Sequence, residues 1–328
     1  MTVESIVTTL TTHWKFDYET HVGALRDLYE TAKKQQWNAA TDIPWELEIN
    51  KEGVGDVLDP TAERFKRYDF VKALPPEKRI EFAAKRSAWS LSQFLHGEQG
   101  ALLCCGQLVE AVPDIDGKLY AATQVVDEAR HVEVFHRYIK LLDQVYPIEP
   151  VLQGVLNAIL EADLWQMKCV GMQVITESLA MGSFKAMQAG TKDDLLRNIV
   201  ELTAQDEARH VSYGLIYMKE ELPRMSDPDR ERIEDFAVGA VRALATGGGG
   251  SSAGGMSSRQ KIYEEMGIDY DAAIAEIREK DSDPAFQESA PSTLRDHVVP
   301  QLDRVGLITD RVAPQYRELG FQVGSAVS

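Results

Sequence analysis

The sequence predicts an all-α protein built around a bundle of long helices. Apolar residues recur at three- and four-residue steps over several segments of more than twenty residues, which is the repeat of a helix with one buried face. We find no run of alternating β-branched residues bounded by hairpin turns, so no sheet is expected. With 328 residues, of which 44% are apolar, the chain can bury a large core.

The first expected helix covers residues 4–36, and a partly buried loop held by Trp37 and Trp45 follows it. Two prolines at 75 and 76 then open a helix over about 77–111, because proline fits the first turn of a helix. A turn is expected at 113–117.

The second long helix is expected over about 118–146, where Pro147 ends it by removing a backbone donor. A third stretch covers about 151–189. Gly190 ends that stretch and Thr191 caps a fourth helix, which continues to about residue 222. The core bundle is therefore predicted over residues 77–222, and a further helix is expected over 229–245.

We expect three parts along the chain. Residues 1–245 form one helical domain, and residues 246–258 are a Gly- and Ser-rich flexible linker, which is favoured over a lid. Residues 259–328 are interrupted by Pro284, Pro291 and Pro300, so they are expected to form short helices that pack on the core.

Charge and composition exclude several classes of protein. The net charge of −17 disfavours binding to nucleic acid or to an anionic membrane, which both require a basic face. No apolar run approaches the roughly 18 residues of a membrane span, and the first residues do not resemble a secretion signal. Three cysteines without a Cys-x-x-Cys pattern fit structural thiols in a reducing compartment. A cytoplasmic location is expected.

One functional pattern occurs twice. The segment Asp-Glu-Ala-Arg-His stands at 127–131 and again at 206–210, which is an offset of 79 residues. The same offset relates Glu98 to Glu177. Each half therefore supplies a Glu, a second Glu 30 residues later and a His three residues beyond that. Together the halves supply Glu98, Glu128, His131, Glu177, Glu207 and His210.

This spacing predicts a site for two metal ions. Glu and His at positions i and i+3 lie on one face of a helix, about one turn apart, so both can reach a single ion. At 1.5 Å per residue, the two carboxylates of each helix pair come to about the same height in the bundle. Four buried carboxylates without cations would repel one another at high cost, and two imidazoles with four carboxylates are ligands that suit iron.

These residues resemble the ferritin-like di-iron carboxylate proteins. That family includes the multicomponent monooxygenase hydroxylases, the ribonucleotide reductase small subunit and the arylamine N-oxygenases, and the resemblance covers about residues 77–222. It implies a ferritin-like four-helix bundle with additional peripheral helices. It also implies two iron ions, or a manganese–iron pair, with Glu98, Glu128 and His131 on one ion and the other three residues on the second, some Glu side chains bridging.

The resemblance extends to residues around the ligands. It implies that Asp127 and Asp206 hydrogen-bond the ligand imidazoles, and that Arg130 and Arg209 join this outer network. Surface ion pairs are the alternative for these four residues.

Three positions depart from relatives. Phe135 stands where most ribonucleotide reductase small subunits have a radical-storing tyrosine, and Met181 replaces the threonine of the multicomponent hydroxylases. Thr203 stands where the N-oxygenases have an additional histidine ligand, which disfavours a centre with seven ligands of that type.

An apolar substrate pocket is expected one helical turn from the ligands, although an ordinary place in the bundle core is favoured for each lining residue taken singly. Its expected lining residues are Ala101, Leu102, Phe135, Ala180, Met181 and Phe184.

The resemblance implies a di-iron oxygenase that activates dioxygen and hydroxylates, N-oxygenates or desaturates a small organic or lipid-like substrate. No flavin or iron–sulfur motif occurs in the sequence, so an external ferredoxin or reductase is expected to supply electrons. A homodimer is also expected. Two alternatives remain open: a radical-generating or ferroxidase-like oxidase, and an iron-storage or structural bundle.

Overall fold

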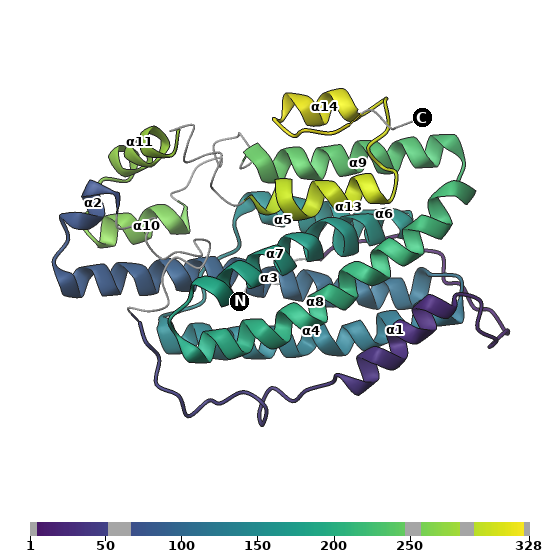
Figure 1. Ribbon diagram of the computed structural model, residues 1–328, viewed down its shortest axis with the longest axis horizontal. Coiled ribbons are helices and arrows are strands. Elements are labelled where there is room, and N and C mark those ends of the chain that lie inside the picture. The colour runs from purple at the N-terminus through teal and green to yellow at the C-terminus, as the bar shows by residue number, and fades with distance from the viewer. Residues whose placement is uncertain (1–4, 52–66, 247–256, 283–291, 325–328) are drawn as a thin grey trace.

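Four long helices form the centre of the molecule. The computed structural model describes residues 5–51, 67–246, 257–282 and 292–324, and all regular elements in these ranges are helical. Helix α3 (Pro76–Ala111) packs along α4 (Ile115–Leu142), and α7 (Glu177–Gly190) packs along α8 (Asp194–Glu221). Contacts between α4 and α8 join the two hairpins (Figure 1). The prediction of an all-α protein with a bundle of four core helices is confirmed.

Aspartates set the beginnings of two core helices. Asp114 accepts a hydrogen bond from the backbone N–H of Gly117, so α4 begins at Ile115 and Gly117 lies inside the helix rather than in the expected turn. Asp193, not the predicted Thr191, caps α8 by accepting from the N–H of Leu196.

Helix α4 ends at Leu142, four residues before the predicted end. The chain after it crosses to α3. There the Ser92 hydroxyl accepts from the Tyr146 N–H, and the side-chain amide oxygen of Gln93 accepts from the Glu149 N–H. These bonds satisfy the backbone without a further helical turn.

The third predicted helix is instead four elements. They are α5 (Pro150–Glu161), α6 (Trp165–Cys169), the π-helix η2 (Val170–Thr176) and α7. The break after α5 is stabilised by Lys168, whose ammonium donates to the carbonyls of Ile159 and Leu160 at the end of α5. Helix α5 lies in the connection between the two helix hairpins.

The prediction of a helix over residues 4–36 is wrong for most of its length. Only α1 (Gly23–Lys34) forms, and the described residues before it are irregular. That segment finds its backbone partners on the core: the N–H of His13 donates to the carbonyl of Glu110, and the N–H groups of His21 and Val22 donate to Asp116 at the start of α4.

Peripheral helices cover the bundle (Figure 1). In chain order they are α2 (Asp69–Lys72), η3 (Leu222–Arg224), α9 (Asp227–Thr246), α10 (Ser258–Glu265), α11 (Tyr270–Asp281), η4 (Leu294–Val298), α13 (Val299–Arg304) and α14 (Ala313–Glu318).

Helix α9 matches the helix expected over 229–245. Buried residues of α10 and α13 join the same apolar clusters as the core helices. Most of the predicted linker at 246–258 lies outside the described residues. None of the helices that the structure describes is long and apolar enough to cross a membrane.

Candidate metal centre

The six predicted ligand residues lie together in the middle of the bundle. Glu98 comes from α3, Glu128 and His131 from α4, Glu177 from α7, and Glu207 and His210 from α8. Glu98 is 4% exposed and the other five are at most 2% exposed. Residues that are more than 100 positions apart in the chain therefore share one water-poor site.

Two of the carboxylates contact both imidazoles. Glu128 places one oxygen 3.2 Å from His131 Nδ1 and the other 3.2 Å from His210 Nδ1. Glu207 does the same, at 3.3 Å from His131 Nδ1 and 3.1 Å from His210 Nδ1. Carboxylates placed between two nitrogen ligands in this way are suited to bridge two ions.

The remaining two carboxylates, Glu98 and Glu177, have different neighbours. Glu98 Oε2 is 3.1 Å from His131 Nδ1. An oxygen of Glu177 accepts from the amide of Gln124 at 3.0 Å.

Ligand atoms close enough to hold one ion form two groups. The first contains Glu98, Glu128, His131 and Glu207, and the second contains Glu128, Glu177 and His210. This grouping differs from the expectation of one ion per half, because Glu207 joins the first group as well as contacting His210.

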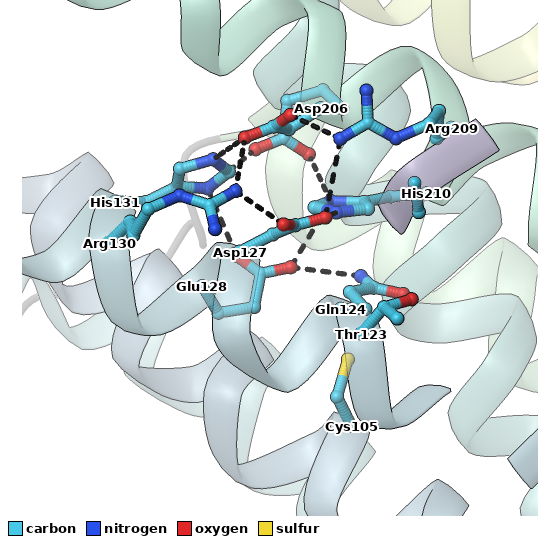
Figure 2. A network of polar contacts seen from close by, with 12 residues as sticks. Cys105, Thr123, Gln124, Asp127, Glu128, Arg130, His131, Asp206, Arg209 and His210 are labelled. Atoms are coloured by element: carbon cyan, nitrogen blue, oxygen red, sulfur yellow. Dashed lines mark hydrogen bonds and ion pairs between the residues drawn. The ribbon is translucent and has the colours of Figure 1, made fainter. Parts of the chain in front are cut away.

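The outer nitrogens of the imidazoles bind aspartates from the opposite half (Figure 2). His131 Nε2 lies 3.2 Å from Asp206, and His210 Nε2 lies 3.3 Å from Asp127. An aspartate at Nε2 fixes the ring so that Nδ1 faces the centre. Sequence reasoning placed the aspartates behind the imidazoles, but it did not show that each pair joins two helix hairpins.

The two arginines close a network around these aspartates. Arg130 and Arg209 each donate to Asp127 and to Asp206, and all four side chains are at most 8% exposed. These are buried contacts, not the surface ion pairs that were the alternative. Burial of paired charges is tolerated because each carboxylate has several donors.

Residues after α1 complete this network, and sequence reasoning did not identify them. The Gln36 amide donates to Asp127 at 2.9 Å, and the Trp37 indole N–H donates to Asp206 at 2.7 Å. Trp37 also lies under the Arg130 guanidinium, 4.9 Å from it. The only signal in the sequence was that Trp37 belongs to a partly buried loop.

Burial and crowding shift the acidities of the site. Burial, followed by the charges of neighbouring carboxylates, raises the pKa of Glu177 well above its usual range; for Glu98, burial and those carboxylates outweigh the lowering effect of His131. Burial lowers the pKa of His210, but the charges of Glu128 and Glu207 outweigh it and raise the pKa to about 10. Burial also lowers the pKa of His131, but the neighbouring carboxylates, above all Glu98, outweigh it and raise that pKa. In the metal-free chain these groups therefore keep their protons to a higher pH than usual.

The residues fit a pair of cations. Glu207 Oε1 is buried without a hydrogen-bond donor, and the donors within reach of the four glutamates are too few to balance their charge. Oxygen and imidazole ligands in this number suit two first-row metal ions such as iron or manganese.

A cavity of about 220 Å³ borders the centre. Glu98 and Glu177 form part of its wall, with Ala101 and Ala180 beside them. The other lining residues are Trp89, Ser90, Gln93, Phe94, Gly97, Leu152, Thr176 and Leu179. Among the residues that the structure describes, no lysine, arginine or histidine lines the wall.

Only two of the six residues expected to line a pocket, Ala101 and Ala180, border this cavity. Leu102, Phe135, Met181 and Phe184 do not. The rings of Phe135 and Phe184 stack at 5.3 Å, and Phe184 contacts Phe94, so the α4 side is filled by aromatic packing. The cavity lies instead toward α5, whose Leu152 lines it.

Comparison with known proteins gives a family match. A family model described as p-aminobenzoate N-oxygenase AurF matches residues 19–247. No curated protein matches.

Among solved structures, the chain is similar to an R2-like ligand-binding oxidase with an aerobically reconstituted metal cofactor (18% identity, TM-score 0.43, covering 83% of this chain and 93% of that one). It is also similar to a mutant of such an oxidase with an anaerobically reconstituted Mn/Fe cofactor (18% identity, TM-score 0.47, covering 81% and 92%).

Proposed function

Because the chain belongs to the p-aminobenzoate N-oxygenase AurF family, we propose that it oxidises a neutral, apolar organic amine at its nitrogen with dioxygen at a di-metal centre. The observation that carries this proposal is the position of Glu98 and Glu177, which belong both to the six-residue centre and to the wall of the apolar cavity. A substrate in the cavity would thus lie directly beside the metal ligands.

The six residues Glu98, Glu128, His131, Glu177, Glu207 and His210 would hold two iron ions, or one manganese and one iron. Bound there, the ions would supply the binding and reduction of dioxygen. The protein contributes orientation: Asp206 and Asp127 fix His131 and His210 so that each Nδ1 faces the centre. Bundle packing keeps water from the site, which strengthens every charge interaction within it.

The cavity supports a neutral substrate. Its wall offers aromatic and aliphatic side chains such as Trp89, Phe94 and Leu152, and no cationic group that could pair with a carboxylate. Placing an unpaired carboxylate there would cost several kcal/mol, on the order of the penalty for burying an ion. We therefore expect a neutral arylamine to be preferred over the anionic p-aminobenzoate.

Electrons must come from another protein. All three cysteines are buried free thiols, and burial raises the pKa of Cys104 to about 12, so none is suited to redox exchange or to a cluster. A ferredoxin or a reductase is proposed as the donor. A homodimer is also proposed, with the exposed side chains of Leu103 on α3 and Val126 on α4 as candidates for its interface.

The test uses labelled dioxygen. Protein loaded anaerobically with Fe(II) and supplied with a chemical reductant is exposed to ¹⁸O₂ with p-toluidine or with p-aminobenzoate, and the products are analysed by mass spectrometry. The proposal expects ¹⁸O on the nitrogen of the toluidine product and much less product from p-aminobenzoate. Oxygen consumption without labelled product would instead indicate an oxidase, and fewer than about one ion per chain would indicate a structural bundle.

A further inference from the structure

The duplicated pattern includes one pair of positions that differ. Gln124 stands four residues before Glu128, and Thr203 stands four residues before Glu207, so the two are related by the offset of 79. Both are fully buried. The Thr203 hydroxyl donates to the carbonyl of Ile199 within its own helix. Gln124 instead reaches the centre.

Gln124 contacts the group of ligands that has fewer members. Its Nε2 donates to Glu128 at 2.9 Å and to Glu177 at 3.0 Å (the bond to Glu128 is drawn in Figure 2). These carboxylates belong with His210 to the three-residue group, whereas the group around His131 has four residues. The amide therefore contacts two of the three residues that this group contains.

The other end of the amide has no partner. Gln124 Oε1 is buried and accepts no hydrogen bond. A carboxamide has nearly the same shape with its oxygen and nitrogen exchanged, so a rotation of the amide group puts Oε1 where Nε2 now lies. That position is 2.9 and 3.0 Å from one oxygen of each glutamate. Such separations, about 3 Å, are those of neighbouring ligand atoms on one ion with bonds of about 2.1 Å.

We propose that Gln124 is a metal ligand of the His210 subsite, bound through Oε1 after its amide rotates. In the metal-free chain the two N–H bonds of the amide offset the negative charge of Glu128 and Glu177. Beside a cation the same N–H bonds are repelled, while the carbonyl oxygen is a hard donor suited to Fe(II) or Mn(II). Thr203 is too short and its hydroxyl already donates to the Ile199 carbonyl, so the His131 subsite has no counterpart of this amide.

This inference rests on the proposed function, because it requires that the centre bind two cations. The first measurement is an anaerobic titration with Fe(II), and with Mn(II) followed by electron paramagnetic resonance. Gln124→Leu is expected to weaken the binding of one of the two ions by about 10- to 100-fold. Thr203→Val is the matched control and is expected to bind both ions as the wild type does. Gln124→Glu keeps an oxygen donor and is expected to keep two ions.

The second measurement separates a ligand from a residue that only holds Glu177 and Glu128 in place. Infrared difference spectra between metal-free and Mn(II)-loaded protein, with ¹³C-labelled glutamine side-chain carbonyls, should show a carbonyl band that moves to lower frequency on loading. The band should be absent from Gln124→Glu and Gln124→Leu and present in Thr203→Val.

Unchanged affinity in a folded Gln124→Leu, or a wild-type spectrum without this shift, would overturn the assignment. If Gln124→Leu does not fold, the wild-type and Gln124→Glu spectra still show whether the Gln124 carbonyl binds the metal. A wild type that binds no metal would instead contradict the proposed function itself.

Discussion

At the scale of single residues, Gln36 and Trp37 make the two halves of the centre unequal. They are consecutive in the chain, yet one donates to Asp127 and the other to Asp206. The aspartate behind His210 therefore has an amide donor, and the aspartate behind His131 has an indole donor. Because these aspartates orient the imidazoles, the two ions should bind with different affinities.

Trp37→Phe removes the donor to Asp206 and keeps an aromatic ring beneath Arg130. We expect about a 10-fold loss of affinity for the ion at His131, since groups behind metal-binding histidines typically contribute about 10- to 100-fold. Isothermal titration with Mn(II) measures it. Trp45→Phe is the matched control, because the Trp45 indole donates to the backbone carbonyl of Ala39, outside the network. Equal losses in both variants would contradict the assigned role.

Glu128→Ala tests the bridging position. Glu128 contacts both imidazoles and belongs to both ligand groups, so its removal should weaken the binding of both ions. It should also abolish the optical change that follows an oxygen pulse on the reduced protein. Glu133→Ala, an exposed residue of the same helix, should leave the trace intact. An unaltered oxygen response in Glu128→Ala would remove this residue from the centre.

The sequence predicted the six central residues because a repeated spacing along helices translates directly into a shared face. It did not predict Gln36 or Trp37, since their contacts depend on how a non-repeating segment crosses α4 and α8. Thr203 and Gln124 are related by the same offset of 79, but the repeat shows only that the two residues differ and not that Gln124 reaches the centre. Periodicity reveals what is duplicated, and it says little about positions where the halves differ.

At the scale of elements, the long core helices were predictable and several of their ends were not. Helix α3 begins and ends within one residue of expectation because prolines and the apolar repeat mark it. The end of α4 depends on the Ser92 hydroxyl, which accepts from the Tyr146 N–H 54 residues along the chain. The break between α5 and α6 depends on the Lys168 ammonium, which folds back to donate to the end of α5. Such bonds are properties of the folded bundle and leave no local pattern.

Asp116 fixes α1 to α4, and its replacement should loosen that contact. It accepts from the N–H groups of His21 and Val22 and pairs with Arg26. Asp116→Asn should lower the free energy of unfolding by about 1–3 kcal/mol, the range for hydrogen bonds to charged groups. Denaturant titration measures this, with the exposed Asp229→Asn as control.

The pH dependence of the same variant follows from the acidity of Asp116. Burial raises its pKa, but hydrogen bonds from Val22 and His21 and the pair with Arg26 lower it below 3.8 overall. A lowered pKa in the folded state means that the stabilisation is present above about pH 4 and is lost as the pH falls through the folded-state value. The wild type should lose this contribution in acid, whereas Asp116→Asn should have none to lose.

At the scale of the whole molecule, metal loading and proton release should be linked. Glu98, Glu177, His131 and His210 all have raised pKa values in the metal-free chain, so they keep protons to a higher pH than usual, and entering cations must displace those protons. Affinity for Fe(II) should therefore fall as the pH falls from 8 to 6, and loading in weak buffer should acidify the solution. Loading without proton release would contradict this assignment of charges.

The stability of the metal-free fold should fall as the pH rises, whereas the affinity for Fe(II) should increase as the pH rises. Groups with raised pKa values bind protons more tightly when folded, so their contribution is complete below the unfolded value and is lost as the pH rises through the folded value. For His210 this window runs from 6.5 to about 10. The melting temperature of metal-free protein should decline across it, while the loaded protein should not show this loss. Thermal scans of metal-free and metal-loaded protein at several pH values measure this difference in melting temperature.

The crossed aspartate–histidine pairs have a consequence for the ancestry of the chain. Asp127 serves the imidazole of the second hairpin, and Asp206 serves that of the first. A lone hairpin would therefore carry an acid with no ring to hold and a ring with no acid behind it. Two identical copies facing each other across a two-fold axis would supply both. The present chain holds both halves of such a self-complementary pair in one polypeptide, with α5 in the connection between them.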